Sequence, residues 1–95
     1  MRRLLGIPAV LALLCAGCGH PATRAECDEL FAKNAEIELR SQHITDPKQV
    51  EDKIAGARAT EGDSFASRCV GKRITERALA CVRRATTAEQ LDRCL

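Results

Sequence analysis

Large apolar side chains are scarce in most of this chain. Residues 18–95 contain 14 of them among 78 residues, a share close to that of disordered proteins. Fully buried, they would contribute roughly 20 to 40 kcal/mol, whereas ordering the backbone costs on the order of 1 kcal/mol or more per residue. A stable fold therefore needs covalent cross-links. The length also excludes a large enzyme barrel or a dinucleotide-binding unit.

The amino-terminal segment differs sharply in composition from the rest. Arg2 and Arg3 precede an uncharged, mostly apolar run over residues 4–14, and the small residues Ala16 and Gly17 follow. This pattern is typical of an export signal. As a helix, the run would extend only about 16 Å, roughly half of the hydrocarbon thickness of a bilayer. We therefore expect residues 1–17 to be a cleaved signal peptide, and a retained membrane helix is the poorer interpretation.

The end of this segment, Leu14-Cys15-Ala16-Gly17-Cys18, resembles the lipobox of bacterial prolipoproteins, although that family usually has Leu where this chain has Cys15. The resemblance implies that Cys18 becomes the mature amino terminus and carries acyl chains such as palmitate. More than one chain is what stable membrane anchoring requires. The alternative is ordinary cleavage near Ala16 or Gly17, which would release a soluble exported protein.

Removal of the signal and lipidation of Cys18 leave four cysteines: Cys27, Cys69, Cys81 and Cys94. In an oxidising compartment this even number predicts two disulfides. We favour Cys69 with Cys81, because their midpoint falls at an expected turn near residue 75, and this choice leaves Cys27 with Cys94. The main alternative pairs Cys81 with Cys94.

Capping patterns locate the first helices. Thr23 and Glu26 form a capping-box pattern that opens a helix ending near Ser41. Asp46 followed by Pro47 indicates a second start. Glu61-Gly62-Asp63 is expected to close that helix and to open a third, which carries Phe65 and Cys69 and ends at Gly71.

Two further starts follow, at Thr75 and at a second capping-box pattern formed by Thr86 and Glu89. No stretch alternates β-branched with polar residues, so a sheet is not expected. The fold class predicted is all-α, a small bundle of about four to five short helices cross-linked by two disulfides. Residues 18–22 are expected to be the lipidated cysteine and a short tether, and residues 23–95 the helical domain.

The chain has a formal net charge of +2, but residues 19–95 carry 13 basic and 13 acidic side chains, and these are unevenly distributed. Residues 19–63 hold 6 basic and 10 acidic side chains, whereas residues 64–95 hold 7 and 3. The basic side chains near the carboxyl terminus include Arg68, Lys72, Arg73, Arg77, Arg83 and Arg84. Four of these, at positions 73, 77, 83 and 84, form a candidate surface for an anionic partner. The simpler interpretations are solvated helix ends, or two parts of one domain that attract each other.

Other chemistry is poorly supported by the sequence. His43 with three cysteines is a conceivable zinc set, but the short paired spacing typical of such sites is absent. His20 lies in the tether and His43 in a link between helices, and neither belongs to a nucleophile motif. A neutral domain without Trp or Tyr is also a poor reader of nucleic acid. We therefore expect no catalytic residue, metal or cofactor.

These patterns favour a small lipid-anchored protein of the bacterial cell envelope, exported and membrane-bound through Cys18. Its helical domain would have a non-catalytic binding or structural role, with another envelope protein or an anionic envelope component as partner. The alternative is a soluble exported miniprotein of the inhibitor or effector kind.

Overall fold

The computed structural model describes residues 19–95, which form four helices and a short β ladder. The elements along the chain are β1 (His20–Pro21), α2 (Arg24–Ser41), α3 (Pro47–Cys69), β2 (Arg73–Ile74), α4 (Glu76–Arg84) and α5 (Ala88–Cys94). The predicted class is confirmed, since this part of the chain is a small all-α bundle with two disulfides. The predicted signal peptide and Cys18 lie outside the described residues.

Helix α2 begins where the capping pattern predicts. Thr23 Oγ1 accepts a hydrogen bond from the Glu26 N–H at 3.1 Å, and Glu26 Oε1 accepts one from the Thr23 N–H at 2.9 Å. These reciprocal bonds satisfy two backbone donors that a helix start leaves free. The helix ends at Ser41 as expected, and His43 follows with a left-handed φ of 62° in the turn before α3.

Helix α3 runs through the point at which a break was expected. The prediction that residues 61–63 separate two helices was wrong, because α3 is continuous for 23 residues. Gly62 and Ala66 are buried. About one turn beyond Gly62, the Phe65 ring packs edge-on against the Phe31 ring, with the ring centroids 5.5 Å apart. This packing against α2 outweighs the roughly 1 kcal/mol that a glycine costs inside a helix.

The remaining helix starts are capped by hydroxyl or carboxylate side chains. Asp46 caps α3 and Thr75 caps α4, as predicted. The cap of α5 is Thr87 and not Thr86, so that prediction was wrong by one residue. Thr87 and Gln90 fit the same capping pattern one position later, and the Gln90 side chain accepts a hydrogen bond from the Thr86 N–H at 2.8 Å.

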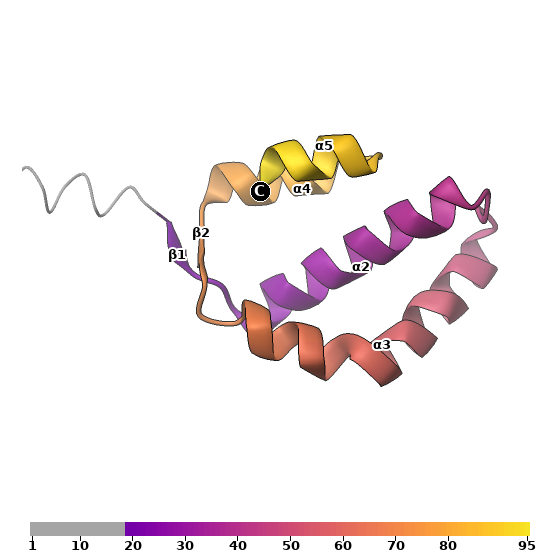
Figure 1. Ribbon diagram of the computed structural model, residues 1–95, viewed down its shortest axis with the longest axis horizontal. Coiled ribbons are helices and arrows are strands. Elements are labelled where there is room, and N and C mark those ends of the chain that lie inside the picture. Colours follow the sequence, from indigo (N-terminus) through magenta and orange to yellow (C-terminus); the bar gives the residue numbers. More distant parts are fainter. Residues whose placement is uncertain (1–18) are drawn as a thin grey trace, which may run out of the picture.

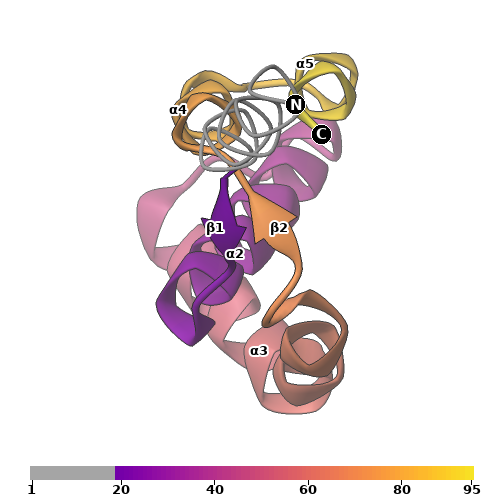
Figure 2. The ribbon, with the colours of Figure 1, turned by 90° about the vertical axis from the view of Figure 1, so that its left-hand side faces the viewer.

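Helix α2 is the middle layer of the bundle. Figure 1 shows α3 antiparallel to α2 along one side, with α4 and α5 along the other. The end-on view in Figure 2 shows the same order, with α2 between α3 and the α4–α5 pair. Helix α2 contacts each of the other three helices, and it contributes Cys27, Phe31 and Ile37 to the interior.

The core consists of two small clusters along α2. The buried members of the first cluster, beside the β ladder, are Ala22, Cys27, Ile74 and Leu79. Those of the second, between α2 and the α4–α5 pair, are Ile37, Val82, Ala85 and Leu91. Leu30 packs against both clusters and joins them. This thin core matches the shortage of large apolar residues in the sequence.

The segment expected to be a tether is part of the fold over residues 19–22. Strand β1 pairs antiparallel with β2 in the register His20 to Ile74, and Ala22 is only 4% exposed. The Ala22 N–H donates to the Lys72 carbonyl at 2.7 Å. Gly19 has a φ of 93°, and a Cβ there would collide with the Ile74 carbonyl. The expectation that no sheet forms was therefore wrong, and residues 19–22, which were expected to be a short tether, pack against the segment around β2.

Every helix, both strands, both disulfides and both core clusters lie within residues 19–95. This segment therefore contains all contacts of the fold described.

Candidate functional site

The four cysteines form two disulfides, but not in the pairing that we favoured. Cys27 is bonded to Cys69 and Cys81 to Cys94, with Cα atoms 5.9 and 5.5 Å apart. The first bond joins α2 to the end of α3, and the second joins α4 to the end of α5. Each bond therefore closes a helical hairpin. Helices α3 and α4, which a bond between Cys69 and Cys81 would have joined, are instead separated by β2.

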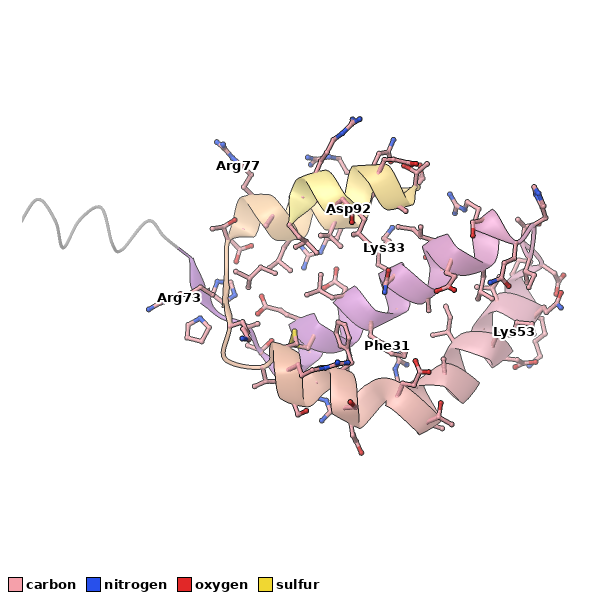
Figure 3. All side chains as sticks on the ribbon, viewed as in Figure 1. Phe31, Lys33, Lys53, Arg73, Arg77 and Asp92 are labelled. Carbon is pink, nitrogen blue, oxygen red and sulfur yellow. A yellow bond between two sulfur atoms is a disulfide. The ribbon has the colours of Figure 1, made fainter. Side chains whose placement is uncertain are left out.

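The basic side chains expected to form one anionic-partner surface divide into two groups. Arg73 lies on β2 and Arg77 in the first turn of α4, and Figure 3 shows both at the end of the molecule that carries β1. Arg83 and Arg84 lie at the opposite end of α4. The four residues therefore do not converge on one site.

Arg83 forms an ion pair with an acidic side chain of the same domain. Its Nη2 donates to Glu29 Oε1 at 3.1 Å, and its Nε donates to Glu29 Oε2. Close by, Lys33 Nζ donates to the Arg83 and Ala85 carbonyls at 3.0 and 3.2 Å, at the carboxyl end of α4. A cation is favoured at that end of a helix. These contacts support the simpler interpretation for Arg83, in which acidic and basic parts of one domain attract each other.

The hydrogen bonds from Arg83 lower the pKa of the Glu29 carboxyl below its ordinary value. A carboxylate whose pKa is lowered by folding stabilises the fold above its unfolded pKa, and this contribution is lost as pH falls through the lowered folded pKa. We expect Glu29→Gln to reduce the free energy of unfolding at neutral pH by at most about 1 kcal/mol, because the pair is partly exposed. The difference from the native chain should vanish in acid.

Urea unfolding at neutral and acidic pH measures this effect. Glu51→Gln is the matched control, since Glu51 is exposed and has no ion pair among residues 19–95. A Glu29→Gln deficit that persists at the acidic end would rule out the ion pair as its cause.

At the β1 end, three potential metal ligands lie close together. Ligand atoms of His20, Glu26 and Glu76 lie within 4.8 Å of one another. His20 Nε2 is 2.8 and 2.9 Å from the two Glu26 carboxylate oxygens, and Glu26 also accepts the Thr23 N–H. The pKa of Glu26 is lowered, first by that backbone hydrogen bond and then by His20. The Glu26 carboxylate oxygens thus already accept hydrogen bonds from groups of the protein. The cluster is best described as a hydrogen-bonded link between β1 and α2.

Neither the contact between His20 and Glu26 nor the packing of the β1 segment was predicted. The sequence did contain one indication of this contact: the capping box places Glu26 at the start of α2, six residues after His20. His43 lies exposed in the link between α2 and α3, as predicted.

Several basic side chains of this part of the chain have no carboxylate partner among residues 19–95. Arg73 Nη1 donates to the Gly19 carbonyl at 2.8 Å. Within the described range, Lys72, Arg73, Arg77 and Arg84 form no ion pair with a carboxylate. Lys72 and Arg73 both line a cavity beside β2. These side chains are available to an external anion.

These features define the class of the protein as a small all-α domain, cross-linked by two disulfides and closed at its amino-terminal end by a β ladder. No protein-family model, curated protein or solved structure matches the chain. None of the helices in residues 19–95 has the length and apolar character needed to cross a membrane. The two disulfides are compatible with an exported protein.

Proposed function

We propose that this chain is a small lipid-anchored protein of the bacterial cell envelope, with a non-catalytic binding or structural role. The observation that carries the proposal is the lipobox-like segment ending at Cys18, directly before Gly19, which contacts the β2 segment. Lipid on Cys18 would then be attached one residue from the domain, with no long linker. The two disulfides suit the oxidising side of a membrane.

A short attachment would hold the β1 end of the domain close to the membrane surface. Arg73 and Arg77 lie at that end (Figure 3) and have no carboxylate partner among residues 19–95. Anionic lipid head groups attract basic side chains near a membrane surface by roughly 1 kcal/mol each. We propose that these two arginines orient the anchored domain, and that Arg83, which is paired with Glu29, does not.

Fatty-acid labelling tests the anchor. In a bacterial host given an alkyne-bearing fatty acid, the full chain should incorporate the label. Cys18→Ser should abolish the incorporation, and the matched control Cys15→Ser should preserve it, because only Cys18 occupies the modified position of the lipobox. An exported, unlabelled native chain would overturn the proposal and favour the soluble alternative.

Vesicle binding tests the orientation by arginines. Residues 19–95 carry no lipid, so their association with phosphatidylglycerol vesicles at low salt reports the surface charge alone. The double variant Arg73→Gln, Arg77→Gln should bind more weakly, by about fivefold for each cation removed. The control is Lys48→Gln with Lys53→Gln on α3; Lys53 lies at the far end of the molecule (Figure 3). Equal losses in the two double variants would contradict a specific role for the β1 end.

A further inference from the structure

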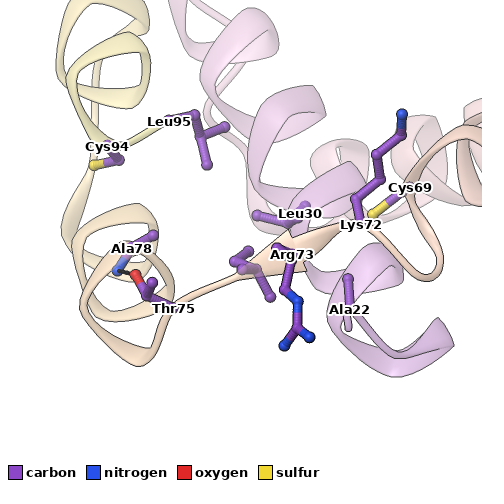
Figure 4. A pocket seen from close by; sticks show the side chains of 10 residues that line it. Ala22, Leu30, Cys69, Lys72, Arg73, Thr75, Ala78, Cys94 and Leu95 are labelled. Carbon is purple, nitrogen blue, oxygen red and sulfur yellow. Dashed lines mark hydrogen bonds between the residues drawn. The ribbon is translucent and has the colours of Figure 1, made fainter. Parts of the chain in front are cut away.

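A cavity of about 280 Å³ lies where α2, β2, α4 and the end of α5 meet. Figure 4 shows Leu30, Ala78 and Leu95 around it. These three side chains, together with Ile74, make its lining largely apolar. Leu95 is 73% exposed at the end of the chain, so this part of the wall is open to solvent.

Two disulfides form part of the lining. Cys69 and Cys94 both border the cavity, and each is bonded to a cysteine of another helix, Cys27 and Cys81 respectively. The surrounding segments are therefore held in place covalently before any ligand arrives. A preformed site of this kind lowers the ordering cost of binding.

The charged part of the lining is cationic. Lys72 and Arg73 border the cavity, and within residues 19–95 neither forms an ion pair. Figure 4 shows their head groups at its edge, pointing in different directions. Arg73 also donates to the Gly19 carbonyl, whereas Lys72 is free to move toward an anion. The cavity thus combines an apolar interior with a positive rim.

We propose that this cavity binds the alkyl chain of a single-chain anionic amphiphile, such as a medium-chain fatty acid, with Lys72 holding the head group. The volume of about 280 Å³ is just below the usual range of ligand pockets, which begins near 300 Å³. A space of this size suits one short alkyl chain better than a larger ligand. We take a chain of about ten carbons with a carboxylate or phosphate head as the occupant to test.

Exposed apolar side chains near the cavity agree with this assignment. Val70 and Leu95 are the exposed large hydrophobic residues of the described chain, at 48% and 73%. Of these two, Leu95 lines the cavity. An alkyl chain that extends out of the cavity at Leu95 would cover apolar surface that is otherwise in water.

The test uses residues 19–95 with both disulfides formed, because the helices, strands, disulfides and core clusters described above all lie in this segment. Titration with decanoate below its micellar concentration, followed by amide chemical shifts, should move signals of the cavity lining. Lys72→Gln should weaken decanoate binding roughly three- to fivefold, as expected for a partly exposed ion pair, and should leave decanol binding unchanged. Lys53→Gln is the charge-matched control and should have no effect.

A second pair of variants tests the apolar interior. Ala78→Phe should fill the cavity and weaken decanoate binding more than tenfold, provided that its circular dichroism remains helical. If that variant does not fold, Leu95→Ala takes its place, because Leu95 is exposed and its loss should weaken binding without disturbing the fold. Unchanged affinity in the folded variants, or shifts confined to the groove between Asn34 and Thr87, would overturn the proposal.

Lysophosphatidylglycerol, a membrane lipid with one acyl chain, distinguishes the two sources of such a chain. If it displaces decanoate from the same signals below its micellar concentration, a membrane lipid is the source; if it does not, the source is a free fatty acid. Both results require decanoate in the cavity and so support the site. The assay omits Cys18, so its failure would leave the proposed anchor standing, and loss of the anchor would leave this site standing.

Discussion

Replacement of both Cys27 and Cys69 by alanine is expected to lower the free energy of unfolding by about 4 kcal/mol. The disulfide between them spans 42 residues of sequence, so its loss frees a long loop in the unfolded chain. Cys27 is also fully buried in the core cluster beside the β ladder. Because a small domain has only about 5 kcal/mol or a little more in total, we expect the variant to keep only about 1 kcal/mol and to unfold at a much lower temperature than the native chain.

The double variant Cys81→Ala, Cys94→Ala is the control, and circular dichroism during heating measures both. That disulfide spans 13 residues, for which the same model gives about 3 kcal/mol. We expect this variant to retain a cooperative transition at a lower temperature. Equal stability of the two variants would contradict the prediction that the two disulfides contribute differently to the free energy of unfolding.

Leu79→Ala should cost about 2 to 5 kcal/mol, the usual range for a leucine removed from a packed interior. Leu79 is 2% exposed and is one of the largest fully buried side chains of the described chain. The core has few other large residues that could move into the space left by the leucine side chain. We therefore expect the loss of stability to lie in the upper half of this range.

Leu95→Ala is the matched control for this prediction. The same change of side chain at a position that is 73% exposed should alter stability by no more than about 0.5 kcal/mol. Urea denaturation compares the two variants, since the midpoint reports stability when the slope is unchanged. A Leu79→Ala variant as stable as Leu95→Ala would show that the cluster beside the β ladder is not the core of the domain.

The helix starts were predictable because capping is local. Thr23, Asp46 and Thr75 each bond to a backbone N–H three residues further on. A pattern of this kind is visible in four consecutive letters and needs no knowledge of the rest of the fold. The same locality explains the error at α5, where adjacent threonines offer two equivalent starts.

The error in the disulfide pairing follows from the error at Gly62. A break at Gly62 would end the helix that packs against α2 before Cys69 is reached. With that break assumed, the hairpin that α2 forms with the whole of α3 could not be recognised. The midpoint of Cys27 and Cys69 is residue 48, close to the actual turn between these helices. The rule that cysteines at equal distances from a turn lie side by side was therefore sound, but it was applied to the wrong turn.

The β ladder and the internal ion pair could not be predicted, because both join distant residues. Each strand has two residues, too few for any alternation, and β1 pairs with residues more than 50 positions later. Arg83 and Glu29 are likewise 54 residues apart. Composition indicated a basic segment, but only the packing of α4 on α2 shows that Arg83 pairs with Glu29, whereas Arg73 and Arg77 have no carboxylate partner among residues 19–95.

A tryptic digest of the native protein without reduction tests the central structural claim most directly. Trypsin should place the four cysteines in four separate peptides, which are residues 25–33, 69–72, 78–83 and 94–95. Mass spectrometry should find 25–33 joined to 69–72, and 78–83 joined to 94–95. Detection of 69–72 joined to 78–83, or of 25–33 joined to 94–95, would contradict the two closed hairpins on which the fold and the cavity depend.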